Sequence, residues 1–205
     1  MSPHISRKRL FGIDRSGPNP EQTRSDQPLN PWTIPNAIGL LRLLGIPVFL
    51  ILALSSRDGR DTVATVVYAV IGWADYLDGF AARLTGQYSR LGALLDPVVD
   101  RLLIIAGVAV AFDFSLLPRW ALAVAVAREL FMLALSRYAL AKRVEIEINW
   151  FGRVGVAPMM GAPFFAMAGV HWLALIMLYA GLALALIATA LYVRRGLALI
   201  ASSSA

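Results

Sequence analysis

Apolar residues dominate this chain after its first 30 positions, in segments of about 20 residues that short polar breaks separate. These segments cover residues 34–54, 62–84, 91–112, 117–140, 150–170 and 172–193. A helix of about 20 apolar residues is long enough to cross the hydrocarbon core of a bilayer. The pattern therefore predicts an all-α, polytopic integral membrane protein with six transmembrane helices.

The polar ends of the chain define its expected organisation. Residues 1–30 are basic and rich in Pro, Ser and Asp, without an apolar run, and we expect a cytoplasmic tail of little fixed structure. Residues 31–196 form the predicted six-helix membrane domain, and residues 197–205 a short C-terminal tail.

Composition agrees with a membrane protein and excludes some sites. Hydrophobic residues make up 58% of the chain, above the roughly 45–50% of soluble domains. The chain has no Cys, which excludes disulfides and thiolate metal sites. A net charge of +6 is compatible with nucleic-acid binding, but the basic residues flank the apolar segments and form no single stripe, so we expect no nucleic-acid partner.

The distribution of basic residues predicts the orientation in the membrane. They concentrate on one side of the predicted spans, in the tail and in segments 85–90, 141–149 and 194–195. The opposite side carries Arg57, Arg60 and Arg119. Because cytoplasmic loops carry the excess of Lys and Arg, both termini and the 85–90 turn should face the cytoplasm.

Four aspartates interrupt the second and third apolar segments, namely Asp75, Asp78, Asp96 and Asp100. An Asp at the bilayer centre costs about 2.5–3.5 kcal/mol on insertion scales, so these side chains need a compensating partner. Spacings of three and four residues place each pair on one helix face. A cluster of carboxylates without His or Cys suits hard divalent cations such as Mg²⁺ or Mn²⁺.

The residues around these acids resemble a known signature. The chain follows the pattern D-x2-D-G-x2-A-R-x8-G-x3-D-x3-D, which is typical of the CDP-alcohol phosphotransferases, integral membrane enzymes of phospholipid synthesis. All eight fixed positions are filled, by Asp75, Asp78, Gly79, Ala82, Arg83, Gly92, Asp96 and Asp100. The resemblance implies a polar, metal-containing cavity, open to the cytoplasm and to lipid, and a homodimer.

The resemblance also implies residue roles. Asp75, Asp78 and Asp96 look like metal ligands, and Asp100 looks like a general base that also touches a metal. Two metal ions can clamp a diphosphate and stabilise the entering and leaving oxygens. The residues expected to bind CDP are Asn36, Gly79, Ala82, Arg83, Ser89 and Gly92. For the glycines alone, close helix packing is the alternative interpretation.

The first predicted span resembles the family segment P-N-x-x-(T/S)-x-x-R. Pro35, Asn36 and Arg42 match it, whereas Gly39 stands where the family usually has a hydroxyl residue. Any contact that this hydroxyl makes in the family is therefore not expected here.

Two arginines outside the signature are candidates for binding the acceptor. Arg128 precedes Glu129 on the fourth span, where a structural ion pair is the alternative interpretation. Arg153 belongs to Gly152-Arg153-Val154-Gly155-Val156, where phosphatidylglycerophosphate synthases usually show G-K-x-K-T. With one cation instead of two, this segment is more similar to the cardiolipin synthases of the family, whose acceptor is a phosphodiester.

The expected function is transfer of a phosphatidyl group from CDP-diacylglycerol to a glycerol-type alcohol, with release of CMP. The favoured acceptor is phosphatidylglycerol, and the alternatives are glycerol 3-phosphate, inositol phosphate and serine. An ion or proton transporter with buried carboxylates would explain intramembrane acids. It would not explain the glycines and the arginine in register with them. A catalytically silent scaffold is the remaining alternative.

Overall fold

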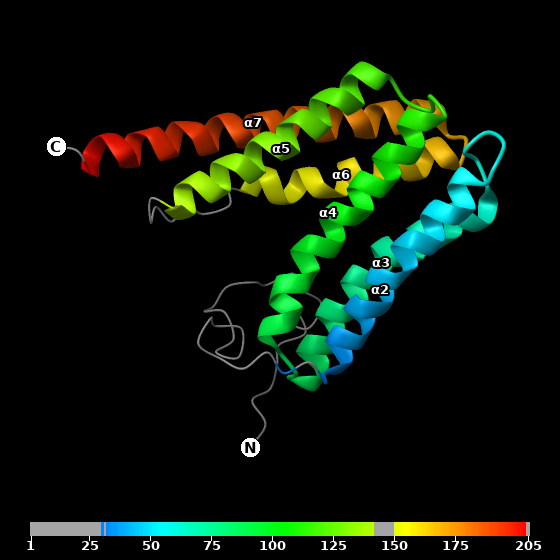
Figure 1. The fold of residues 1–205 in the computed structure, drawn as a ribbon, viewed down its shortest axis with the longest axis horizontal. Coiled ribbons are helices and arrows are strands. Elements are labelled where there is room, and N and C mark those ends of the chain that lie inside the picture. The colour runs from blue at the N-terminus through cyan, green and yellow to red at the C-terminus, as the bar shows by residue number, and fades with distance from the viewer. Residues whose placement is uncertain (1–29, 31, 142–149, 204–205) are drawn as a thin grey trace. The chain divides into compact units, whose positions relative to one another are not determined.

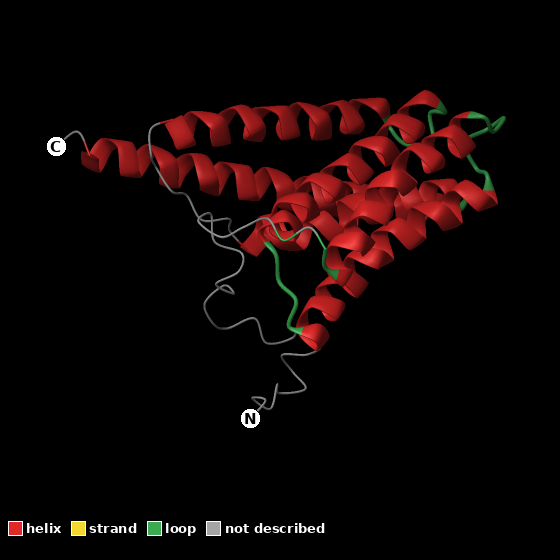
Figure 2. Ribbon diagram, turned by 60° about the horizontal axis from the view of Figure 1, so that its bottom comes forward, coloured by secondary structure: helices red, strands yellow, loops and turns green. Residues whose placement is uncertain are grey.

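The computed structural model describes residues 30, 32–141 and 150–203. These residues form helices joined by turns, without any strand among them (Figures 1 and 2). The helices are α2 (Ile34–Leu54), α3 (Thr62–Thr85), α4 (Arg90–Asp113), α5 (Arg119–Ala141), α6 (Trp150–Met167) and α7 (His171–Ser203). The predicted all-α class is confirmed, and each predicted apolar segment corresponds to one helix. The predicted tail 1–30 lies outside the described residues apart from Asn30.

Local residue chemistry accounts for where several helices begin and end. Thr33 caps α2 by accepting a hydrogen bond from the Asn36 backbone N–H at 3.3 Å, and a proline occupies the first turn. Gly86 follows α3 with a φ of 67°, the left-handed conformation that commonly ends a helix. Gly169 ends α6 in the same way, with a φ of 78°. α7 continues to Ser203, past the predicted end of the last span.

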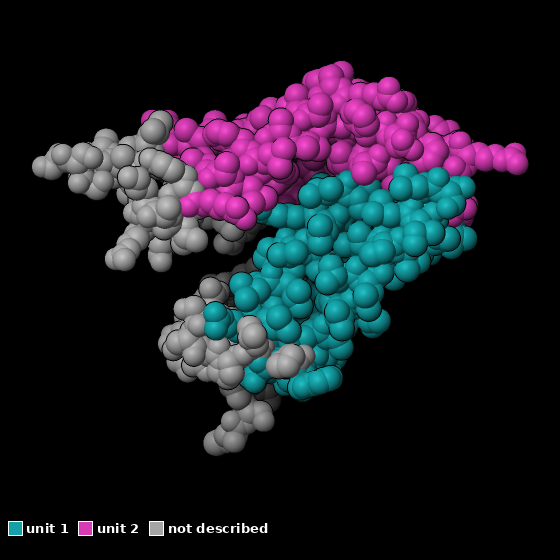
Figure 3. Space-filling model, viewed as in Figure 1, with its two compact units in different colours: residues 1–55, 63–106 teal, residues 56–62, 107–205 magenta. Residues whose placement is uncertain are grey.

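The chain divides into two compact units (Figure 3). The first unit comprises residues 1–55 and 63–106, and therefore contains α2, almost all of α3 and the beginning of α4. The second comprises residues 56–62 and 107–205, and contains the end of α4 with α5, α6 and α7. The four aspartates of the signature all belong to the first unit.

Small residues and aromatic contacts bring α2 and α3 together in the first unit. A Cβ on Gly45 would lie 3.0 Å from the Ile71 side chain, so a larger residue there would push the helices apart. One turn further along, the rings of Phe49 and Tyr68 pack with centroids 5.0 Å apart. This close packing sets the distance over which polar groups on the two helices can meet.

Helix α2 buries its polar residues and exposes many of its apolar ones. Its buried positions include Asn36, Gly39 and Arg42, whereas Leu41 and Ile51 are 69% and 66% exposed. Soluble proteins bury the apolar face of a helix instead. An outward-facing apolar surface of this kind is typical of a helix surrounded by lipid.

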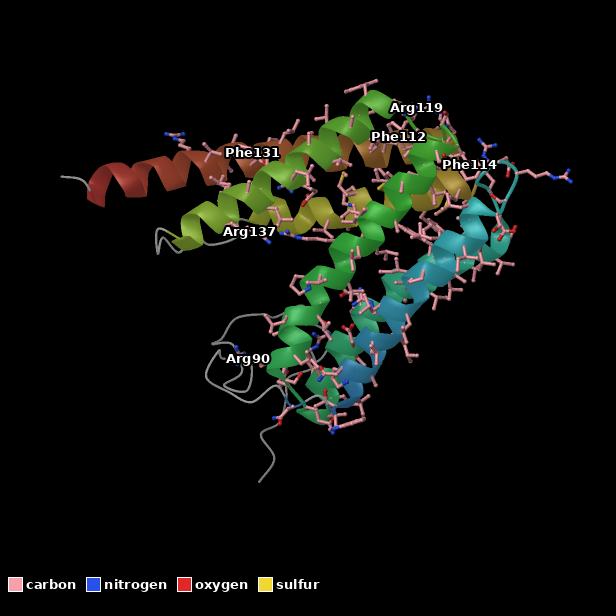
Figure 4. The ribbon with its side chains drawn as sticks, in the orientation of Figure 1. Arg90, Phe112, Phe114, Arg119, Phe131 and Arg137 are labelled. Atoms are coloured by element: carbon pink, nitrogen blue, oxygen red, sulfur yellow. The ribbon has the colours of Figure 1, made fainter. Side chains whose placement is uncertain are left out.

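In the second unit, α7 packs against both α5 and α6. A Cβ on Gly181 would lie 3.0 Å from the Met159 backbone nitrogen, so α6 and α7 approach closely at this glycine. At the turn between α4 and α5, the Arg119 guanidinium lies 5.3 Å from the centre of the Phe112 ring and donates from Nε to the Phe112 carbonyl (Figure 4). The second group of candidate residues lies in this unit, with Arg128 on α5 and Arg153 on α6.

Two of the described helical segments are long and apolar enough to cross a membrane, Ile34–Leu54 and His171–Arg194. Val154–Met167 is apolar but shorter. Helices α3 and α4 carry the four aspartates, and α5 carries Arg128 and Glu129. Charged side chains lower the average hydropathy of these three helices.

Candidate active site

The side chain of Arg42 lies among the carboxylates of the signature. Its Nη1 donates to Asp75 Oδ1 at 3.0 Å and to Asp78 Oδ2 at 2.9 Å, and its Nη2 donates to Asp100 Oδ1 at 2.6 Å. Its Nε donates to the Ile71 carbonyl at 3.1 Å. The guanidinium therefore ties α2 to α3 and α4 through charge-assisted hydrogen bonds, the strongest class in proteins.

The spacing of the aspartates explains how two helices present them to one arginine. Asp75 and Asp78 lie one turn apart on α3, and Asp96 and Asp100 lie one turn apart on α4. A Cβ on Gly39 would lie 4.0 Å from Asp96 Oδ1, so Asp96 faces the same side of α2 as the other acids. Three of the four carboxylates thus bond with Arg42, and Asp96 lies beside the same helix.

The donor chemistry of this cluster fits a hard divalent cation. All four side chains offer carboxylate oxygens, the ligands that Mg²⁺ and Mn²⁺ prefer. In the described part of the chain, no three Asp, Glu or His side chains surround a common point suited to a metal ion. Three of the four acids point instead at Arg42. The metal ligands therefore stay a prediction, and so does the number of ions.

A cavity of about 180 Å³ lies next to the acids within the first unit. Asp78 and Asp96 line it together with all six predicted CDP-binding residues, which are Asn36, Gly79, Ala82, Arg83, Ser89 and Gly92. Small-molecule sites usually measure about 300–1,000 Å³, so this cavity has room for part of a nucleotide. Six of the eight signature residues thus line one cavity, all except Asp75 and Asp100.

A hydrogen-bond network fixes one wall of the cavity. Ser89 donates to Asn36 Oδ1 at 2.7 Å and accepts from the Gly92 N–H at 2.9 Å, so it caps the beginning of α4. Asn36 Nδ2 donates to the Asn30 carbonyl at 2.9 Å. A Cβ on Gly92 would lie 2.8 Å from Asn36 Oδ1, closer than real Cβ contacts come. Gly92 is therefore needed for the Asn36–Ser89 contact.

Gly79 and Arg83 lie on adjacent turns of α3 and both line the cavity. A Cβ on Gly79 would lie 3.3 Å from Arg83 Nη1. The glycine therefore leaves the space that the guanidinium uses when it points back along the helix. An arginine in this place can bind the phosphates of a nucleotide.

The family comparison decides the class of this site. Residues 32–193 match the family model described as CDP-alcohol phosphatidyltransferase, which is most of the chain. The chain belongs to the CDP-alcohol phosphatidyltransferase family. The resemblance carried by the spacing of the eight signature residues is thereby confirmed, and with it the prediction of an enzyme of phospholipid synthesis.

Curated relatives in the family have two kinds of name. A Streptomyces coelicolor protein named cardiolipin synthase (CMP-forming) is 36% identical over 169 residues, covering 78% of this chain and 77% of the relative. An Escherichia coli protein named CDP-diacylglycerol–glycerol-3-phosphate 3-phosphatidyltransferase is 33% identical over 168 residues, covering 78% and 88%. A Mycobacterium tuberculosis putative cardiolipin synthase is 44% identical over 89 residues, covering 43% and 41%.

The two predicted acceptor-binding arginines belong to the second unit. Arg128 pairs with Glu129 and donates from Nε to Thr189 Oγ1 at 2.9 Å, which joins α5 to α7. Thr189 in turn donates to the Ala185 carbonyl at 2.8 Å. The ion pair considered as the alternative for Arg128 is therefore present. Arg153 lies in α6, and its side chain is outside the described residues.

Sequence reasoning assigned no role to Arg42 or to some of the residues that line the cavity. Arg42 was matched to a family segment, but its contacts with the acids were not predicted. A charged side chain inside an apolar span needs a partner, and this was the available signal. Gln87 and Tyr88 also line the cavity, and Gln87 Oε1 accepts from the Ile34 N–H at 3.1 Å. They lie in the variable x8 part of the signature, where spacing carries no information.

Proposed function

We propose that this protein transfers a phosphatidyl group from CDP-diacylglycerol to the hydroxyl of a glycerol-type acceptor and releases CMP. The observation that carries the proposal is the cavity, because the six predicted CDP-binding residues and two of the acids line it together. In the reaction, the acceptor oxygen forms a bond to the phosphorus that bears diacylglycerol. The bond from that phosphorus to the oxygen of CMP breaks.

Different residues of the first unit bind the nucleotide, accept the proton and hold the metal ions. The cavity binds CDP, with Arg83 at the phosphates and Asn36, Ser89, Gly79, Ala82 and Gly92 around the cytidine. Asp100 accepts the proton of the attacking hydroxyl as general base. Asp75, Asp78, Asp96 and Asp100 would hold one or two Mg²⁺ or Mn²⁺ ions. When bound, such ions neutralise the diphosphate and stabilise the entering and leaving oxygens.

The acceptor we favour is phosphatidylglycerol, which makes the product cardiolipin. Residues 152–156 carry one cation, Arg153, where two would suit the doubly charged phosphomonoester of glycerol 3-phosphate. The Streptomyces coelicolor relative carries the matching name. Arg128 is the second cation that we assign to the acceptor.

Glycerol 3-phosphate is the second candidate acceptor. The Escherichia coli relative is named for it and aligns over 88% of its own length. Inositol phosphate follows as a third candidate. An ion or proton transporter is the contrasting class, and it predicts no release of CMP.

We further propose that all six helices span the membrane, with both termini and the active site on the cytoplasmic side. The excess of basic residues in segments 85–90 and 141–149 supports this orientation. The apolar outer face of α2 supports a lipid surrounding. The homodimer implied by the resemblance to the family is part of the same proposal.

One experiment tests the activity and the acceptor together. Purified protein receives labelled CDP-diacylglycerol with Mg²⁺ or Mn²⁺, and phosphatidylglycerol, glycerol 3-phosphate, inositol phosphate and serine are offered separately. We expect CMP and labelled cardiolipin with phosphatidylglycerol, and none of either in EDTA. Formation of phosphatidylglycerophosphate would instead identify glycerol 3-phosphate as the acceptor. No CMP with any acceptor would refute the proposed function.

A further inference from the structure

Arg42 is a buried cation whose partners come from two other helices. Its side chain is 1% exposed, whereas those of Asp75 and Asp100 are 45% and 26% exposed. Four hydrogen bonds hold it, three to carboxylates and one to a backbone carbonyl. Each of the three carboxylates uses one of its two oxygens in its contact with Arg42.

The charges in this cluster are unequal. One guanidinium faces three carboxylates. The fourth carboxylate, that of Asp96, lies beside Gly39 on α2, the helix that carries Arg42. Carboxylates repel one another strongly where water is scarce, and removing the single cation from a buried cluster leaves the acids uncompensated. The positive charge of Arg42 therefore offsets part of this repulsion between the helices.

We propose that Arg42 is the built-in counter-cation of the carboxylate cluster. It holds α2, α3 and α4 together when no divalent cation is bound, and its positive charge weakens the binding of that cation. Arg42 is thus a positioning residue, which acts on the reaction through Asp75, Asp78 and Asp100. The second half of this inference rests on the proposed metal site, whereas the first half does not.

Replacing Arg42 with Gln should separate these two effects. In the absence of metal the variant loses its counter-cation, and we expect its melting temperature to fall by several degrees. A bound divalent cation replaces the lost charge, so Mn²⁺ should restore most of the stability. With the repelling guanidinium gone, Mn²⁺ should bind Arg42→Gln at least tenfold more tightly than the unchanged chain.

The measurement uses the full chain in detergent micelles, unfolded by heat in EDTA and in Mn²⁺. Electron paramagnetic resonance of free Mn²⁺ gives the affinity without any need for turnover. Arg42→Lys, which keeps the charge but loses the fork of donors, should show an Mn²⁺ affinity near that of the unchanged chain. Its melting temperature in EDTA should lie between those of the unchanged chain and Arg42→Gln.

Phe49→Leu is the matched control for a structural effect. Phe49 is fully buried on the same helix and packs on Tyr68, away from the acids. Its truncation leaves a cavity and should lower the melting temperature equally in EDTA and in Mn²⁺. If Arg42→Gln behaved in the same way, Arg42 would be a packing residue and the proposal would be overturned.

A double variant tests the counter-cation role without metal. In EDTA, adding Asp100→Asn to Arg42→Gln removes one of the mutually repelling charges. We expect the double variant to melt at a higher temperature than Arg42→Gln. A lower melting temperature would contradict the proposal, because two independent structural losses add.

The remaining outcomes are also decisive. Arg42→Gln that folds in Mn²⁺ but not in EDTA supports the proposal, and Arg42→Gln that folds in neither overturns it. If Mn²⁺ had no effect on the unchanged chain, the proposed metal site and the metal half of this inference would fail. The double variant in EDTA would then decide the counter-cation half by itself.

Discussion

Ser89 donates its hydroxyl hydrogen to Asn36 Oδ1 at 2.7 Å and so joins the beginning of α4 to the beginning of α2. The two residues are 53 positions apart in sequence, and both line the cavity. The same hydroxyl caps α4 by accepting from the Gly92 N–H. One oxygen atom thus shapes the cavity wall and fixes the helix that carries Asp96 and Asp100.

Ser89→Ala should weaken both the helix cap and the contact with Asn36. A lost cap costs about 0.5–2 kcal/mol, and a buried acceptor left without its donor costs about 1–3 kcal/mol. We expect a lower melting temperature and a higher KM for CDP-diacylglycerol. Ser89→Thr, which keeps the hydroxyl, is the control, and an unchanged KM in Ser89→Ala would remove this residue from the nucleotide site.

Gly92→Ala should disrupt the same contact from the other side. The added methyl group would lie 2.8 Å from Asn36 Oδ1 and 3.2 Å from Ser89 Oγ, so one of these side chains must move. Overpacking of this kind costs about 1–3 kcal/mol. A thermal melt and a CDP-diacylglycerol titration measure the loss. Gly86→Ala is the control. Its added methyl group meets no atom within 4 Å, so this variant measures only the loss of stability caused by a side chain at positive φ.

Asp100→Asn should abolish the proposed proton acceptor. An amide does not accept the proton of the attacking hydroxyl, and general base catalysis contributes about 10²–10⁴-fold. We expect kcat for CMP release to fall by at least about 10²-fold, with CDP-diacylglycerol still bound. Asp113→Asn, an exposed position at the end of α4, makes the same chemical change as a control. Full turnover of Asp100→Asn would disprove the base assignment.

Gly39→Ser should be accepted without loss of stability. A Cβ at this position meets only Asp96 Oδ1, at an ordinary contact distance of 4.0 Å. The serine hydroxyl would then be able to donate a hydrogen bond to Asp96. The melting temperature in EDTA measures the effect, and a clear decrease would show that the space beside Asp96 is needed.

Arg128→Gln should raise KM for the acceptor and leave KM for CDP-diacylglycerol unchanged. This prediction follows from the proposed acceptor role, but Arg128 also joins α5 to α7 through Thr189. Thr189→Val removes that joining contact while keeping the arginine, and serves as the control. If both variants lost stability equally and neither changed KM for the acceptor, Arg128 would have the structural role alone.

The helices were predictable because their signal is local. The lengths of the apolar runs predicted the six helical segments. Thr33 caps the beginning of α2, and Gly86 and Gly169 end α3 and α6 in the left-handed conformation. α7 extends further than predicted, because the helix continues past Arg194 and Arg195, where the apolar segment ends. Basic residues after an apolar run mark the edge of a membrane, and a helix does not have to end there.

The candidate site was predictable in its members but not in its contacts. The resemblance to the family identified the four acids and the six expected CDP-binding residues, and those six all line the cavity. It did not show that Arg42, at a separation of 58 residues, would bond with Asp100. Nor did it show that Gly92 makes room for Asn36, since a glycine in sequence does not reveal which neighbour uses the space.

The burial of Arg42 on α2 has a consequence for how the chain is made. In the six-span topology that we propose, α2 is made before α3 and α4, so its arginine would enter the bilayer before any of its three carboxylate partners exists. An unpaired arginine at the centre of a single helix costs about 2.5–3.5 kcal/mol on insertion scales. The first helix therefore becomes fully stable in the bilayer only once the next two have been inserted, and a nascent chain that stops after Leu54 lacks every partner that its arginine requires.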